Sequence, residues 1–196
     1  MKQFAQLLLL QLFHACLLLI PTLAFWPRPI DKPLYAFVAV ILTAAMSECL
    51  MTRSSVQGKV AIYDPTALIA AQAVGVIMLL GFWAAQLEAL SNRHIAQPVQ
   101  IAAAIFCVIG IGLRLSAIFA LGPRFRTDIV VESVVRIGIY KYLKHPSEFG
   151  LLFLSVSAPS IIGSYRTSTA MALVLTPISI WRIHRENLAL DAKVIA

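Results

Sequence analysis

Residues 122–128 read GPRFRTD and residues 138–148 read GIYKYLKHPSE, and this polar stretch interrupts a chain that is otherwise almost continuously apolar. Its basic and imidazole side chains fall within a short span: Arg124, Arg126, Arg136, Lys141, Lys144 and His145. Long apolar segments on both sides indicate membrane helices, since about 20 apolar residues suffice to cross hydrocarbon. The polar interruption is therefore where we expect the functional groups.

The composition supports a membrane protein. Of the 196 residues, 60% are apolar and 13% are charged, and the mean hydropathy is +0.84. Soluble domains carry about 25% charged residues, so these values are typical of an integral membrane protein. The net charge of +7 could suggest a nucleic-acid partner. However, the Lys and Arg residues lie in short breaks between apolar segments, which the positive-inside rule explains, and we expect no nucleic acid.

Four apolar segments have the length of a membrane-spanning helix. They cover residues 4–25, 34–51, 65–87 and 98–121, and the last two begin with a proline, which suits the first turn of a helix. The first segment could pass for a signal peptide, but it exceeds the usual apolar core of about 7 to 15 residues and lacks a small-residue cleavage site. We expect it to be retained as a span.

Two shorter apolar segments, residues 149–162 and 169–180, follow the polar stretch, and each is too short to cross comfortably alone. We expect a tilted helical hairpin, either two short spans or a re-entrant pair, with its tip near residues 163–166 and a kink at Pro177. The predicted fold class is all-α: a polytopic transmembrane helix bundle of four spans plus a C-terminal helical hairpin, in a single domain over residues 1–196. Residues 1–112 form the predicted spanning scaffold.

The distribution of basic residues predicts the orientation of the bundle. With the polar stretch and both termini in the cytoplasm, eleven Lys and Arg residues lie inside and four lie outside. The inside set is Lys2, Arg53, Lys59, Arg124, Arg126, Arg136, Lys141, Lys144, Arg182, Arg185 and Lys193; the outside set is Arg28, Lys32, Arg93 and Arg166. The polar stretch and the C-terminal segment then share the cytoplasmic face of what we expect to be the cytoplasmic membrane.

His145 precedes a proline and is expected at the entrance of a helix. The unpaired N–H groups there, together with Lys144, suit a carboxylate or another anion. Alternatively, His145 simply caps the helix and Lys144 contacts lipid phosphates. Glu148, in the first turn, is read as an acid that interacts favourably with the helix dipole.

Arg182 and Glu186 are four residues apart, so they share one helical face and project toward the same entrance. An ordinary surface pair of this kind is the competing interpretation. Arg114 lies within the fourth span, where a buried guanidinium is costly, so it should face the bundle interior or reach the boundary, with Glu48 as a possible partner. Gln11, His14 and Glu88 are interpreted as interhelical polar contacts.

Several common kinds of active site have no signature here. There is no Gly-rich dinucleotide loop, no phosphate-binding loop, no metal-ligand constellation and no nucleophile elbow. The three cysteines, Cys16, Cys49 and Cys107, lie in apolar segments without metal or redox spacing and are read as small core residues.

The C-terminal part of the chain resembles the isoprenylcysteine carboxyl methyltransferase family, which also includes phospholipid N-methyltransferases. The resemblance covers residues 113–191, and the matching positions are Leu113, Arg114, Leu121, Gly122, Phe125, Thr127, Gly138, Tyr140, Tyr142, His145, Pro146, Arg182, Ile183, Glu186 and Leu190. Departures from the family pattern are Ile139 for Pro, Lys144 for Arg, Glu148 for Tyr and Asn187 for Glu. These substitutions bear on the acceptor more than on the cofactor.

The resemblance implies that residues 113–191 hold S-adenosylmethionine at the cytoplasmic face and transfer its methyl group to a lipophilic acceptor that arrives through the bilayer. The expected catalytic residues are Arg182, Glu186 and His145; the expected cofactor-binding residues are Tyr140, Tyr142, Lys144, His145, Pro146, Glu186 and Asn187; no metal is expected. Arg182 could orient a carboxylate acceptor. An amine, phenol or thiol acceptor would need a base, for which His145 or Glu186 would serve.

Two other functions remain open at the level of sequence. A sterol-type membrane reductase would use a similar His-Pro entrance for NADPH, although the chain has few spans to enclose a sterol. A non-enzymatic lipid-binding protein would use His145, Arg182 and Glu186 only as interface anchors, and it would bind no cofactor.

Overall fold

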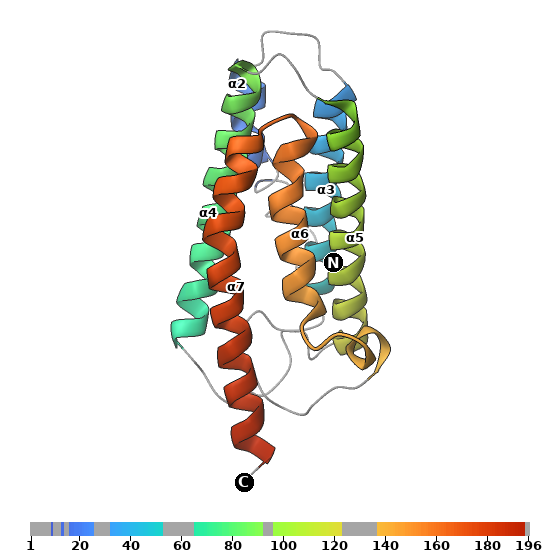
Figure 1. The fold of residues 1–196 in the computed structure, drawn as a ribbon, viewed down its shortest axis with the longest axis vertical. Helices are drawn as coiled ribbons and strands as arrows, with labels where there is room; N and C mark the ends of the chain where they lie inside the picture. The colour runs from blue at the N-terminus through green and yellow to red at the C-terminus, as the bar shows by residue number, and fades with distance from the viewer. Residues whose placement is uncertain are drawn as a thin grey trace.

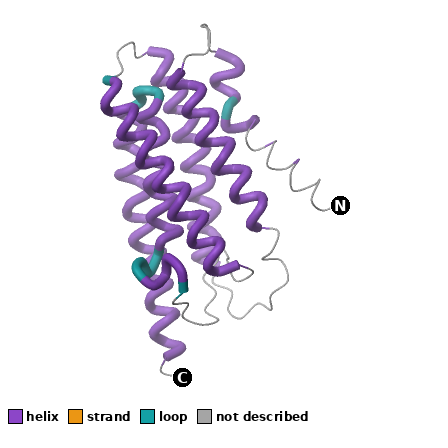
Figure 2. Tube along the Cα trace, turned by 90° about the vertical axis from the view of Figure 1, so that its right-hand side faces the viewer, coloured by secondary structure: helices purple, strands orange, loops and turns teal. Residues whose placement is uncertain are grey.

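The chain forms a bundle of helices that lie side by side (Figures 1 and 2). The structure is a computed structural model that describes residues 9, 13, 16–25, 32–52, 65–91, 96–122 and 137–194. Its elements are α2 (Ile20–Phe25), α3 (Lys32–Thr52), α4 (Pro65–Ser91), α5 (Gln97–Leu121), the 3₁₀-helix η3 (Gly138–Lys141), α6 (Pro146–Ile161) and α7 (Tyr165–Val194). Within these residues every regular element is helical, which confirms the predicted all-α class.

Prolines mark the helix starts as the sequence predicts. Helix α4 begins at Pro65, α5 has Pro98 in its first turn, and α6 begins at Pro146. A proline is tolerated there because its missing N–H would lack an intrahelical acceptor anyway. Among the described residues, two helical segments are long and apolar enough to cross a membrane by length and composition, Gln72–Ser91 and Gln97–Leu121. The apolar part of α3 is shorter, so the predicted count of four spans is not established.

Helices α6 and α7 form the predicted hairpin. Its tip is a turn at residues 162–164, where Gly163 has a φ of 79° and its N–H donates to the Ser160 carbonyl at 3.2 Å. Glycine adopts this left-handed conformation without a Cβ clash. The returning arm differs from the expected short segment: α7 runs for 30 residues from Tyr165 to Val194, with Pro177 inside the helix. The apolar arm and the segment with Arg182 and Glu186 are therefore one helix, whose end extends past the bundle (Figure 1).

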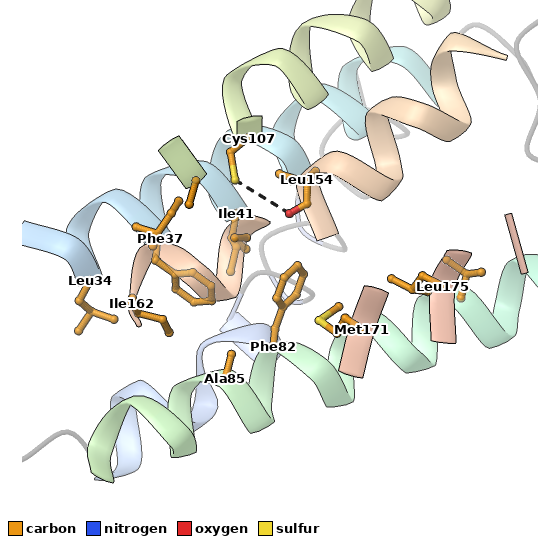
Figure 3. Close-up of a cluster of buried hydrophobic side chains, with 14 residues drawn as sticks. Leu34, Phe37, Ile41, Phe82, Ala85, Cys107, Leu154, Ile162, Met171 and Leu175 are labelled. Carbon is orange, nitrogen blue, oxygen red and sulfur yellow. Dashed lines mark hydrogen bonds between the residues drawn. The ribbon is translucent and has the colours of Figure 1, made fainter. Parts of the chain in front are cut away.

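The core lies where α3 to α7 meet (Figure 3). The rings of Phe37 on α3 and Phe82 on α4 pack edge to face, with their centroids 6.0 Å apart. Met171 and Leu175 on α7 belong to the same buried cluster, as does Leu154 on α6. This cluster fixes the hairpin against the rest of the bundle, and so fixes the place where the N-terminus of α6 meets α7.

Polar contacts also join the helices. The buried Gln86 side chain on α4 accepts from the Thr22 N–H at 3.0 Å and donates to the Leu18 carbonyl at 2.7 Å. Glu88, one residue beyond the predicted third span, lies in the last turns of α4, and its carboxylate accepts from the N–H groups of Arg166 and Thr167. Glu88 is thus an interhelical contact, as predicted, and it caps α7.

Some sequence-based expectations fall outside the described residues. These concern Gln11, His14, part of the first apolar segment and residues 123–136 of the polar stretch. The side chain of Glu48, the proposed partner of Arg114, is also outside them.

Candidate active site

Helices α5 and α6 approach each other closely because each presents a glycine to the other. A Cβ at Gly110 would lie 2.8 Å from the Gly150 carbonyl oxygen, and a Cβ at Gly150 would lie 2.6 Å from the Gly110 carbonyl oxygen. Real side chains do not approach backbone atoms so closely, so only glycine permits this crossing. One turn further along α5, Arg114 comes within reach of the first turn of α6, where its guanidinium donates to Ser147 Oγ at 2.9 Å.

His145 stands at the N-terminus of α6, as predicted, and its ring faces α7. Its Nδ1 lies 2.8 Å from Glu186 Oε2, and its Nε2 lies 3.2 Å from Asn187 Oδ1. Because the Glu186 carboxylate can only accept, Nδ1 donates to it. The hydrogen bond to the Glu186 carboxylate raises the pKa of His145 and outweighs the opposite effect of burial.

A second pair joins the same two helices. The Arg182 guanidinium on α7 lies 3.1 Å from Glu148 Oε1 on α6, and only 11% and 12% of these two side chains are exposed. The other carboxylate oxygen, Glu148 Oε2, is buried and has no hydrogen-bond partner. Glu148 therefore does more than interact with the helix dipole, and it retains an open acceptor position.

The two pairs form because the paired residues have similar spacings on the two facing segments. His145 and Glu148 are three residues apart, while Arg182 and Glu186 are four apart, so each helix presents two polar groups on one face. Their alignment joins α6 and α7 by a His145–Glu186 contact and a Glu148–Arg182 contact. Arg182 and Glu186 therefore project toward the α6 entrance, as the sequence predicted. The matched spacing was visible in the sequence, but the role of Glu148 was not recognised from it.

The short helix η3 contributes Tyr140 to the cluster. Burial raises the pKa of the Tyr140 hydroxyl, and the negative charge of Glu186 raises it further. Tyr142 and Lys144 do not join the cluster, because both side chains are exposed. The Lys141 ammonium instead lies over the Tyr142 ring, 5.7 Å from the ring centroid. Pro146 is buried beneath the entrance.

The predicted site residues therefore fall into two groups. His145, Arg182, Glu186 and Asn187 come together at the start of α6, with Tyr140 beside them. Sequence reasoning missed the contacts of Glu148 and Ser147. The described residues, this cluster included, contain no group of three or more His, Cys, Asp or Glu side chains arranged to hold a metal ion.

The arrangement suits a small zwitterionic or cationic ligand. Glu186 is 42% exposed and can offer its carboxylate to an ammonium or hydroxyl group, and Asn187 supplies an amide beside it. The unpartnered Glu148 Oε2 provides a further acceptor. The half-buried Tyr140 ring offers an aromatic face for a cation or a planar base.

The described residues form an all-α bundle with two helices long and apolar enough to cross a membrane, and the candidate site lies at the start of α6. Residues 103–192 match the model of the Isoprenylcysteine carboxyl methyltransferase (ICMT) family, which confirms the resemblance read from the sequence. The C-terminal part of the chain is thus similar to this family of methyltransferases. No curated protein and no solved structure gives a significant match.

Proposed function

We propose that the protein transfers a methyl group from S-adenosylmethionine to a lipophilic acceptor at the cytoplasmic face of the membrane. The observation that carries this proposal is the pairing of the α6 entrance with α7 through His145–Glu186 and Glu148–Arg182. These residues lie within the segment that matches a methyltransferase family. When bound, the cofactor supplies an electrophilic methyl group on a positively charged sulfur.

The residues of the cluster fit such a cofactor. Glu186 and Asn187 would hold its ammonium and ribose hydroxyls, and His145, which contacts both side chains, positions them. The Tyr140 ring would lie against adenine or the sulfonium. The N-terminus of α6 would receive the carboxylate. Residues 113–191 would then act as the cofactor-binding region on the scaffold of residues 1–112.

Methyl transfer from a cationic sulfur is an in-line displacement, so the enzyme must mainly align the two reactants and exclude water. The rigid contacts of α6 with α7 suit this task, because side chains held by ion pairs and packing lose little freedom on binding. An acceptor with a lipid tail would reach the site from within the bilayer, and the excess of basic residues supports a cytoplasmic position for the site and both termini.

The test is equilibrium binding of S-adenosylmethionine to detergent-solubilised protein by calorimetry. Changing His145, Arg182 or Glu186 to Ala should raise the Kd at least about tenfold, which corresponds to about 1.4 kcal/mol. His184→Ala is the matched control, because His184 lies on the same helix and is exposed. Saturable binding that survives all three changes would refute the site, and tight NADPH binding without S-adenosylmethionine binding would refute the reaction.

A second experiment addresses the product. Protein incubated with methyl-labelled cofactor and host membrane extract should yield labelled lipid-soluble material that is absent with Glu186→Ala. If binding is seen but no label is transferred to any lipid-soluble acceptor, the assignment as an enzyme acting on lipids is wrong.

A further inference from the structure

Residues 137–144, here called the η3 segment, present both cations and apolar side chains at one end of the bundle. Tyr142 is 78% exposed and Ile137 is 63% exposed, which are large fractions for such side chains. Lys141 and Lys144 are exposed as well, and neither ammonium pairs with a carboxylate in the part of the chain that the structure describes. A partner that covers both kinds of side chain must offer an apolar region beside an anionic one.

The η3 segment lies at the level where an apolar helix ends. A Cβ at Gly138 would lie 3.3 Å from the Cβ of Ala120, and α5 ends one residue later at Leu121. Figure 1 shows the η3 turn beside that end of α5. Helix α5 is long and apolar enough to cross a membrane. With α5 as a span, the η3 segment lies where the hydrocarbon gives way to the lipid headgroups.

The exposed side chains of the η3 segment match the chemistry at that depth. Tyrosine is enriched at membrane interfaces because its ring is apolar and its hydroxyl is polar. The Lys141 ammonium lies 5.7 Å from the centroid of the Tyr142 ring, so the cation and the aromatic ring form one unit. A Lys side chain near a membrane surface strengthens binding to anionic lipid by about fivefold, and a zwitterionic headgroup provides no such gain.

The same turn carries Tyr140 into the candidate site. The Tyr140 N–H donates to the Ile137 carbonyl at 3.2 Å, and the Tyr142 N–H donates to the Ile139 carbonyl at 3.0 Å. These bonds make the segment one compact turn, in which Tyr140 is partly buried near Glu186 while Tyr142 is exposed. A contact that fixes the exposed side of the turn therefore also fixes the Tyr140 ring.

We propose that the η3 segment binds the headgroup of an anionic phospholipid through Lys141 and Lys144, and that this contact holds Tyr140 in place for the cofactor. The lipid contact depends on the exposed side chains and on the level of the segment, whereas its effect on the cofactor rests on the proposed function. The charge of the bilayer thereby regulates how tightly the protein binds S-adenosylmethionine.

Photo-crosslinking in nanodiscs tests the lipid contact independently of methyl transfer. The full chain is placed in phosphatidylcholine with a trace of photoreactive phosphatidylglycerol or photoreactive phosphatidylcholine, and the labelled residues are identified by mass spectrometry. The phosphatidylglycerol probe should label residues 137–144 at least about fivefold more than the phosphatidylcholine probe at low salt, and less so at high salt. The double variant Lys141→Gln/Lys144→Gln should abolish this preference. The control Lys32→Gln/Arg166→Gln removes two exposed cations outside the segment and should retain it.

Calorimetric binding of S-adenosylmethionine in the same nanodiscs tests the coupling to the site. Wild-type protein should bind the cofactor at least about threefold more tightly when phosphatidylglycerol is mixed into the phosphatidylcholine, and Lys141→Gln/Lys144→Gln should show no difference between the two bilayers.

The two measurements separate the ways in which the proposal can fail. Equal labelling by the two probes, or a preference that survives in Lys141→Gln/Lys144→Gln, would overturn the lipid contact. A lipid preference without any change in cofactor affinity would overturn the coupling through Tyr140. If wild-type protein binds no S-adenosylmethionine in either bilayer, the proposed function fails and the coupling fails with it, while the labelling still decides the lipid contact.

Discussion

Replacing Gly150 by Ala should separate α5 from α6 and disturb the site without touching any of its polar side chains. The added Cβ would lie 2.6 Å from the Gly110 carbonyl oxygen and 2.8 Å from the Arg114 backbone nitrogen. Both are backbone atoms, so no flexible side chain can move aside and the helices themselves must shift.

The size of the effect follows from two opposing terms. Overpacking of a tight interior costs about 1–3 kcal/mol, and clashes with two backbone atoms of α5 favour the upper end. Alanine in place of glycine within a helix returns about 1 kcal/mol. We therefore expect a net loss of about 2 kcal/mol in unfolding free energy. Since Arg114 is itself one of the clashing residues, its hydrogen bond to Ser147 should weaken.

The assay is SDS-induced unfolding in mixed micelles, with S-adenosylmethionine binding measured on the same samples. Gly112→Ala is the matched control, because a Cβ there meets nothing within 4 Å, and this variant should gain up to about 1 kcal/mol. Equal stability and equal cofactor affinity for the two variants would show that the close crossing at Gly150 does not position the site.

Three further predictions concern pH and interhelical polar contacts. The pKa of His145 is raised above its usual value of 6.5, so the stabilisation from its pairing with Glu186 is complete below pH 6.5 and is lost as pH rises through the raised pKa. The unfolding free energy of wild-type protein should therefore fall over that pH interval. A Glu186→Gln variant with the same pH profile as wild type would contradict this. Gln86→Leu removes the hydrogen bonds to Thr22 and Leu18 and should destabilise the bundle by about 0.6–1.7 kcal/mol in SDS unfolding, so unchanged stability would argue against those contacts. Glu88→Ala uncaps α7 and should cost about 0.5–2 kcal/mol while leaving S-adenosylmethionine affinity unchanged, and a large loss of affinity would show that the two ends of the hairpin are coupled.

Helix starts and the hairpin could be predicted from the sequence because they depend on local chemistry. Proline fixes its own φ and lacks an N–H, so Pro65 and Pro146 mark first turns whatever surrounds them. The continuation of α7 through Pro177 could not be predicted in the same way. A proline inside a helix may break it or be accommodated by neighbouring groups in a membrane protein, and which occurs depends on tertiary packing.

In the site, too, some features follow from local geometry and others depend on tertiary packing. Arg182 and Glu186 share a face because they are four residues apart, and that inference needs only helix geometry. The partner of Arg182 is Glu148, 34 positions earlier in the chain, and this pairing depends on how α6 packs against α7. Tyr140 and Tyr142 both belong to the expected set, yet only Tyr140 faces the cluster. Tyr140 lies in η3 and Tyr142 is its C-cap, and at about three residues per turn two side chains two positions apart point in different directions.

The central claim is that the entrance of α6 and the face of α7 act as one binding unit for S-adenosylmethionine. A double-mutant cycle on calorimetric binding tests it directly, with His145→Ala, Glu186→Ala and the double variant. If the two side chains act together, the double variant should bind S-adenosylmethionine no more weakly than the single variant with the lower affinity. Losses of affinity that simply add, or no loss in any variant, would contradict the claim.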